Sequence, residues 1–169
     1  MANLFNFNKL EYIKGRKKPQ VDCILCALRD KNPDIVDLEI TQTELSMVCV
    51  NLYPYNSGHI MIFPQRHIAD FRELSDVESL DIEVLTRASI DIMTKLYNPS
   101  GFNIGFNIGN FSGASITHLH RHIIPRYPNE LGFIDIVGGS KIIVEEPNET
   151  MEKLKEAFND INLEDYRNK

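Results

Sequence analysis

A β-strand with histidine at alternate positions is predicted between Thr117 and Tyr127, where the chain reads T-H-L-H-R-H-I-I-P-R-Y. Alternate side chains of a strand point to the same face, so His118, His120 and His122 should form a row of imidazoles about 7 Å apart. Strands favour β-branched and aromatic residues, so packing does not explain three titratable rings on one face. Imidazole titrates near neutral pH and can act as a nucleophile, a proton shuttle or a metal ligand. We therefore expect this face to carry chemistry.

Further strands are predicted on both sides of this segment. Residues 38–52 favour strands interrupted near 41–44, and a turn at 54–58 leads into a strand at 59–63 that ends at Pro64. Residues 102–108 alternate as a strand does, residues 109–113 form a glycine-containing loop, and the histidine strand should run over 116–124, closed by Pro125.

One long helix is predicted between these groups of strands. Ser75 and Glu78 form a capping box, and apolar residues then recur at helical spacing until the N-P-S-G sequence at 98–101. The apolar positions are Leu80, Val84, Leu85, Ala88, Ile92 and Leu96. A second, shorter helix is marked near the C-terminus by Met151, Leu154, Phe158 and Ile161. This order predicts an α+β fold with an antiparallel sheet of about five strands and helices on one face.

Length and charge narrow the class of protein. The 169 residues fit a single domain over 1–169, and no apolar run approaches the roughly 20 residues needed to cross a bilayer. Residues 1–20 lack the apolar core of a signal peptide, so we expect a cytoplasmic protein without membrane attachment. The net charge of −6 argues against a nucleic acid polymer as partner. A small anionic ligand would need only a local positive pocket, for which the candidates are Arg66, Arg121, Arg126 and Lys141.

The three cysteines fall into two groups. Cys49 lies in the apolar run M-V-C-V and is expected to be a buried core residue. Cys23 and Cys26 form C-I-L-C, a spacing that lets two thiolates reach one metal ion, although two ordinary cysteines near a helix start would look the same.

Two chemical interpretations of the histidine row remain open at this point. In the first, the histidines bind a catalytic zinc ion, with His67 and the C-x-x-C as further ligands. In the second, the middle imidazole attacks phosphorus and forms a covalent intermediate. The loop N-I-G-N-F-S-G-A-S at 107–115 favours the second interpretation, because its glycines allow close backbone approach to a phosphate.

These segments resemble the histidine triad (HIT) superfamily of nucleotide hydrolases and transferases. The triad resembles its H-φ-H-φ-H-φ-φ signature, except that Arg121 replaces an apolar residue. The resemblance extends over almost the whole chain, through E-Y-I in segment 4–13, C-I-L-C at 23–26, L-Y-P-Y-N-S-G-H-I-M-I-F-P-Q-R-H at 52–67, G-F-N-I-G-F-N-I-G at 101–109, G-A-S-I at 113–116 and V-G-G-S-K at 137–141. The P-Y-N turn, G-A-S-I and V-G-G-S-K look most like the diadenosine tetraphosphate phosphorylase and hydrolase branch.

The resemblance implies a catalytic role for four residues. His120 would be the nucleophile that takes a nucleoside monophosphate onto its ring, and His122 would contact the transferred phosphate. His59 looks like the family's supporting fourth histidine, and Ser115 is placed with the catalytic group. The substrate would be an adenine nucleotide or dinucleotide, with phosphate or water as the acceptor.

Nucleotide-binding positions are implied in the same way. Asn51 falls where the family holds the ribose hydroxyls, and the phosphate positions are Asn107, Gly113 and Ser115, together with His122. Ala114 replaces a glutamine found in many relatives, which puts a simple hydrolase assignment in doubt and is compatible with the phosphorylase branch.

A structural zinc site is also implied by the resemblance. Zinc-containing members use the C-x-x-C, the histidine of P-x-x-H and the first triad histidine, which are here Cys23, Cys26, His67 and His118. Two thiolates and two imidazoles make a closed tetrahedral set. Because ideal strand geometry would aim His118 toward the face of His120, either the metal lies beside the active site or the strand begins irregularly.

The implied function is a nucleotide hydrolase or nucleotidyltransferase that acts on adenine (di)nucleoside polyphosphates through a nucleotidyl-histidine intermediate, with diadenosine tetraphosphate phosphorylase as the specific candidate. The implied assembly is a homodimer whose two sheets join. The alternatives are an adenosine phosphoramidase-type hydrolase, a zinc-stapled nucleotide-binding module with little turnover, and a zinc hydrolase.

Overall fold

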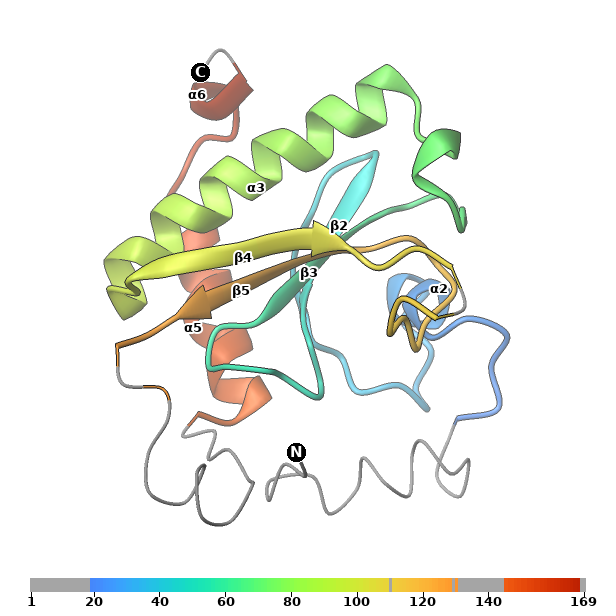
Figure 1. Ribbon diagram of the computed structural model, residues 1–169, viewed down its shortest axis with the longest axis horizontal. Helices are drawn as coiled ribbons and strands as arrows, with labels where there is room; N and C mark the ends of the chain where they lie inside the picture. The colour runs from blue at the N-terminus through green and yellow to red at the C-terminus, as the bar shows by residue number, and fades with distance from the viewer. Residues whose placement is uncertain (1–18, 110, 129, 131–144, 168–169) are drawn as a thin grey trace.

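A five-stranded antiparallel sheet forms the centre of the computed structural model, which describes residues 19–109, 111–128, 130 and 145–167 (Figure 1). The spatial order is β1-β2-β3-β5-β4. The strands are β1 (Glu39–Gln42), β2 (Ser46–Val50), β3 (Ile60–Pro64), β4 (Gly101–Phe106) and β5 (Arg121–Arg126). The predicted α+β arrangement is therefore confirmed.

The helices pack on both sides of this sheet. They are α2 (Ile24–Arg29), the 3₁₀ turn η1 (Phe71–Glu73), α3 (Asp76–Tyr97), α5 (Pro147–Asn159) and α6 (Glu164–Arg167). The long α3 runs across the sheet, and the segment that connects β4 to β5 lies next to α2 (Figure 1). The prediction that all helices lie on one face of the sheet is therefore wrong. It missed α2, whose six residues are too few to show a helical pattern of apolar residues.

Strand periodicity divides the interior into two cores. In β2 and β3, Val48, Val50, Ile60 and Ile62 pack with α3 and α5. The residues between them, Met47, Cys49, Met61 and Phe63, pack with Leu25 and Leu28 of α2. Both faces of these two strands are thus buried, and the α2 face carries the site described below.

The predicted boundaries of α3 are confirmed. The Ser75 hydroxyl accepts from the backbone N–H of Glu78, whose carboxylate accepts from the Ser75 N–H, and Asn98 ends the helix in the left-handed region. Two of the predicted core positions are wrong, because Leu80 and Leu96 are each 44% exposed. Leu80 lies about 140° around the helix from the buried Leu85, so it faces away from the sheet.

The histidine strand begins later than predicted. β5 starts at Arg121, which pairs with Ile62 of β3, and it continues through Pro125 to Arg126. The same register would place Pro64 opposite Leu119. Proline has no N–H to donate to a ladder, and Leu119 instead donates its N–H to the carbonyl of Ile68. Of the triad, only His122 therefore lies within the strand.

Several sequence predictions fall on residues outside the described part. These are the segment 4–13, the V-G-G-S-K segment and Lys141. The assignment of 1–169 to a single domain stays a prediction. Among the residues that the structure describes, no helix is both long enough and apolar enough to span a bilayer.

Candidate functional site

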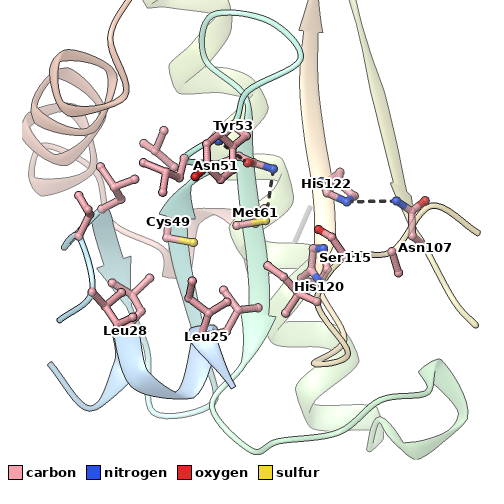
Figure 2. A pocket seen from close by; sticks show the side chains of 18 of the residues that line it. Leu25, Leu28, Cys49, Asn51, Tyr53, Met61, Asn107, Ser115, His120 and His122 are labelled. Atoms are coloured by element: carbon pink, nitrogen blue, oxygen red, sulfur yellow. Dashed lines mark hydrogen bonds between the residues drawn. The ribbon is translucent and has the colours of Figure 1, made fainter. Parts of the chain in front are cut away.

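A cavity of about 290 Å³ opens on the α2 face of the sheet. Its walls come from α2, β2 and β3, from residues of the segments 34–38 and 51–55, and from Asn107 and residues 113–116. His120 and His122 form part of one wall, beside Asn107 and Ser115 (Figure 2). The structure thus brings the predicted nucleotide-binding residues into one cavity.

A chain of hydrogen bonds runs through His59 and His122. The backbone N–H of Tyr55 donates to Nδ1 of His59 at 3.1 Å, so the proton of the neutral His59 ring lies on Nε2. That Nε2–H lies 2.9 Å from Nδ1 of His122, which accepts it. The proton of a neutral His122 ring must then lie on its own Nε2. The turn at Tyr55 therefore determines the tautomers of two successive histidines.

Asn107 closes this chain of hydrogen bonds. Its side-chain amide lies 3.4 Å from Nε2 of His122. Because His122 donates from Nε2, its partner must be the amide oxygen of Asn107 and not the amide nitrogen. Rotating the Asn107 amide by a half-turn about its last side-chain bond exchanges these two atoms. Burial, followed by the neighbouring His120, lowers the pKa of His122 to about 4 and so keeps the ring neutral.

His120 is held by a different contact. Its Nδ1–H donates to the backbone carbonyl of His118 at 2.7 Å, which leaves Nε2 as the basic nitrogen of the ring. The ring is 4% exposed, and burial lowers its pKa from the ordinary value. It lies edge to face with His122, with ring centroids 4.7 Å apart. His120 is therefore a buried, neutral imidazole at the wall of the cavity.

Asn51 lies on the opposite side of the cavity, above Met61 (Figure 2). Its side-chain oxygen accepts from the backbone N–H of Tyr53 at 2.9 Å, and its Nδ2 lies 3.5 Å from the sulfur of Met61. The amide is thus fixed at the cavity wall and separated from the histidines by Met61.

Part of the cavity lining is apolar. It is formed by Leu25, Leu28, Ile35, Val36, Cys49 and Met61. Cys49 is 1% exposed, as predicted for a core cysteine, and burial raises the pKa of its thiol. A flat, apolar group such as a nucleobase suits this part of the cavity.

Three of the four candidate cations, Arg66, Arg121 and Arg126, do not line the cavity, and Lys141 is outside the described residues. Arg121 instead donates to Glu83 at 2.8 Å and to Thr86 at 2.9 Å on the α3 side of the sheet. Arg66 and Arg126 are paired with carboxylates in the same way. Within the described part of the chain, the groups at the cavity that can donate to a phosphate are imidazoles, amides, hydroxyls and backbone N–H groups.

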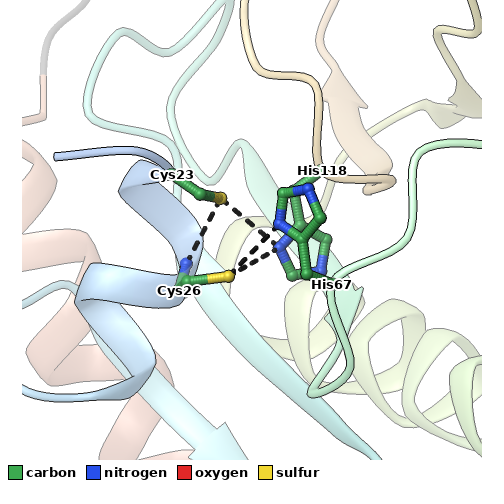
Figure 3. Close-up of side chains that lie close together, drawn as sticks. All are labelled: Cys23, Cys26, His67 and His118. Carbon is green, nitrogen blue, oxygen red and sulfur yellow. Dashed lines mark hydrogen bonds between the residues drawn. The ribbon is translucent and has the colours of Figure 1, made fainter.

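A second cluster of polar groups lies next to the cavity (Figure 3). The sulfur of Cys26 lies 3.3 Å from Nδ1 of His67 and 3.5 Å from Nδ1 of His118, and the sulfur of Cys23 lies 3.6 Å from the latter. All four potential ligand atoms lie within 4.8 Å of one another. Tetrahedral zinc, with Zn–S of about 2.3 Å and Zn–N of about 2.0–2.1 Å, separates sulfur from nitrogen by about 3.6 Å. The four residues fit such an ion.

Local structure explains how this cluster forms. Cys23 caps the N-terminus of α2, with its sulfur 3.5 Å from the N–H of Cys26, so both thiols project from one helix start. His118 is fully buried, its Nε2 donates to the carbonyl of Pro64 at 2.9 Å, and burial lowers its pKa to about 4. The pKa of Cys26 is raised to about 11 by burial and by Cys23, a shift that a bound cation would oppose.

Tyr55 is the functional residue that the sequence did not single out. Besides its N–H contact, its ring stacks on His59 with centroids 5.0 Å apart. The only signal was its position in the turn four residues before His59.

The fold and the site define an α+β protein with two histidines, His120 and His122, at the wall of a cavity of about 290 Å³. A family model described as the HIT domain matches residues 32–129. The chain therefore belongs to the HIT family.

Curated relatives with related names match parts of the chain. An AP-4-A phosphorylase of Mycobacterium tuberculosis is 39% identical over 107 residues, 63% of this chain and 55% of the relative. An adenosine 5'-monophosphoramidase of Schizosaccharomyces pombe is 33% identical over 65% of this chain and 77% of its own length. The asymmetrical bis(5'-nucleosyl)-tetraphosphatase of the same yeast is 33% identical over 57% and 53%. The chain thus spans about half the length of the phosphorylase that it matches.

Solved structures agree on the fold. A zinc-bound histidine triad family protein of Mycobacterium smegmatis superimposes with a TM-score of 0.66, at 20% identity, over 82% of this chain and 94% of that one.

Proposed function

We propose that this protein is an enzyme that transfers a nucleotidyl group from an adenine nucleoside or dinucleoside polyphosphate to an acceptor, with His120 as the nucleophile. The observation that carries the proposal is the 2.7 Å hydrogen bond from Nδ1 of His120 to the His118 carbonyl. It assigns the ring proton to Nδ1 and the reactive lone pair to Nε2 of a neutral, buried imidazole.

Substrate binding follows the two parts of the cavity. In this proposal the base enters the apolar part beside Leu25 and Leu28, and Asn51, which lines the cavity, binds the ribose hydroxyls. The α-phosphate then lies against the wall that carries His120, His122 and Ser115.

The chemistry has two steps. Nε2 of His120 forms a bond to the α-phosphorus, and the bond to the bridging oxygen breaks, so that the remaining polyphosphate leaves with its electron pair. The Nε2–H of His122 and the donors of Asn107, Gly113 and Ser115 stabilise the charge on the phosphoryl oxygens. In the second step the acceptor oxygen attacks phosphorus, and the P–N bond to His120 breaks.

The acceptor decides between the two leading activities. The AP-4-A phosphorylase and the tetraphosphatase among the relatives are named for acting on dinucleoside polyphosphates. Ala114 leaves its position without a side-chain donor, which is compatible with the phosphorylase branch. The phosphoramidase among the relatives keeps an adenosine phosphoramidase-type hydrolase as the alternative.

One incubation separates these activities. Purified protein is mixed with diadenosine tetraphosphate, with and without inorganic phosphate, and the nucleotides are separated by chromatography. Phosphorolysis yields ADP plus ATP only when phosphate is present, whereas hydrolysis yields AMP plus ATP without it. If neither pair forms while nucleotide still binds, release of AMP from adenosine 5'-phosphoramidate identifies the phosphoramidase alternative. No release from that compound either identifies a zinc-stapled binding module with little turnover.

The cofactor proposed is one structural zinc ion, held by Cys23, Cys26, His67 and His118. The 3.3–3.6 Å sulfur–nitrogen distances support it, as does the zinc-bound neighbour of the same fold. Four protein ligands would leave no position for a reactive water, which argues against the zinc hydrolase alternative.

A homodimer is proposed through the edge strand β4. This strand is last in the sheet order, and its Ile104 is 43% exposed. A second copy that pairs with this edge would continue the sheet. Light scattering during size-exclusion chromatography tests this by the mass in solution. The cytoplasmic location stays a prediction.

A further inference from the structure

The nucleophile lies just outside the hydrogen-bonded sheet. The ladder between β3 and β5 begins at Arg121, one residue after His120. Residues 115–120 belong to no strand, and the proline at position 64 prevents the ladder from extending to Leu119. Other contacts must therefore position His120.

His118 makes one such contact with His120 and is itself held by contacts of its own ring. Its backbone carbonyl accepts the Nδ1–H of His120 at 2.7 Å. Its Nε2–H donates to the carbonyl of Pro64 at 2.9 Å, and its Nδ1 lies in the cluster with Cys23 and Cys26. The carbonyl that orients the nucleophile and the ring that fits a metal thus belong to the same residue.

The metal cluster joins three segments around this residue. The cysteines come from α2, His67 comes from the segment after β3, and the His67 and His118 rings lie with centroids 4.7 Å apart. The backbone contact between Leu119 and Ile68, at 2.7 Å, lies between the same two segments. An ion held by the four ligands would restrain both the ring and the peptide of His118.

We infer that His118 is a positioning residue, whose metal-held side chain fixes the backbone carbonyl that orients the His120 imidazole for attack. The inference rests on the proposed nucleophilic role of His120. It assigns the metal site an effect on the rate of nucleotidyl transfer that is separate from substrate binding, because His67 is not among the described residues that line the cavity.

The test changes His67, which is exposed and is not among the described residues that line the cavity. His67→Ala removes one ligand, and His67→Cys replaces it with another zinc ligand. Zinc content, the dissociation constant for AMP by calorimetry, and the rate at which labelled diadenosine tetraphosphate nucleotidylates the protein are measured for each variant. Wild-type protein stripped with chelator and reloaded with zinc provides a second measurement without any substitution.

The inference predicts a split between affinity and rate. The zinc-free His67→Ala protein should bind AMP within threefold of wild type but form the nucleotidyl-protein at least tenfold more slowly. His67→Cys and zinc reloading should restore the rate. The NMR signal of the His120 Nδ1–H, protected from exchange in the zinc-loaded wild type, should be lost in the zinc-free forms.

Two results would overturn the inference. One is a zinc-free protein that reacts at the wild-type rate. The other is a parallel loss of affinity and rate, which would indicate general structural damage. A failure of the proposed function is distinguishable, because His120→Ala would then be nucleotidylated as fast as wild type whatever the His67 variants do.

Discussion

Nε2 of His59 lies 2.9 Å from Nδ1 of His122, and the N–H of Tyr55 holds the other side of the His59 ring at 3.1 Å. His59 is fully buried. It acts on the cavity through His122, by requiring the proton of that ring to lie on the nitrogen next to Asn107.

Replacing His59 should slow catalysis without weakening nucleotide binding. His59→Ala removes the donor to His122, so the wrong tautomer becomes accessible and the phosphoryl oxygens lose a donor. We expect kcat to fall roughly 10- to 100-fold with KM within threefold. Steady-state kinetics measure both, with the exposed Glu152→Gln as the surface control. An unchanged kcat would contradict the tautomer argument.

His122 should remain neutral well below the usual titration range of histidine. Its pKa is lowered to about 4 by burial and then by His120. Between about pH 6.5 and 4, this histidine binds a proton in the unfolded chain but not in the folded protein. Its contribution to the free energy of unfolding is therefore complete above about pH 6.5 and falls as the pH drops toward 4. NMR of the His122 ring carbon-bound protons should show no titration between pH 7 and 5. A midpoint near 6.5 would show that the ring is solvated.

Asn51 provides a test of ribose binding. Asn51→Ala removes both amide atoms, so KM should rise roughly tenfold, about 1.4 kcal/mol, while kcat changes little. Asn51→Asp keeps an acceptor for the Tyr53 N–H and should stay within a few-fold of wild type. Equal KM values for Asn51→Ala and wild type would remove Asn51 from the site.

The ion pair at the start of α3 should make stability depend on acid pH. Arg66 donates to both carboxylate oxygens of Glu78, at 3.1 and 2.9 Å, and this pairing lowers the pKa of Glu78 to about 2. Because the folded pKa is depressed, the stabilisation is present above about pH 4.5 and is lost as the pH falls toward 2.

Urea unfolding of Glu78→Gln should show this difference. At pH 6.5 we expect a loss of about 1–3 kcal/mol relative to wild type, shrinking as the pH falls below 4.5. The exposed pair of Arg72 with Asp70 offers a control, since Arg72→Ala should cost much less stability than Glu78→Gln. A pH-independent difference between Glu78→Gln and wild type would contradict the ion-pair explanation.

The sequence predicted local features better than long-range ones. The capping box of Ser75 and Glu78 is a contact between near neighbours, and the alternation in β2 and β3 follows from backbone geometry alone. The late start of β5 depends on which residue the sheet register places opposite Leu119, and no single segment encodes that register. Its consequence is that His118 leaves the row of histidines.

The same reasoning applies to the site residues. The four predicted metal ligands are found together. They could be predicted because the C-x-x-C and the two histidines stand at fixed positions of sequence motifs. The role of Tyr55 could not be predicted, because it depends on a backbone N–H that only the folded turn aims at His59. The pairing of Arg121 with α3 likewise depends on which face of β5 it occupies.

The central claim is that His120 forms a covalent bond to the nucleotide. The most direct measurement quenches the protein with acid-free denaturant during turnover of diadenosine tetraphosphate labelled at the α-phosphorus, and maps the label by mass spectrometry. The account predicts an acid-labile AMP adduct on His120 in wild type, no adduct in His120→Ala, and a fall in turnover of about 10³-fold or more in that variant. Wild-type turnover by His120→Ala would contradict it.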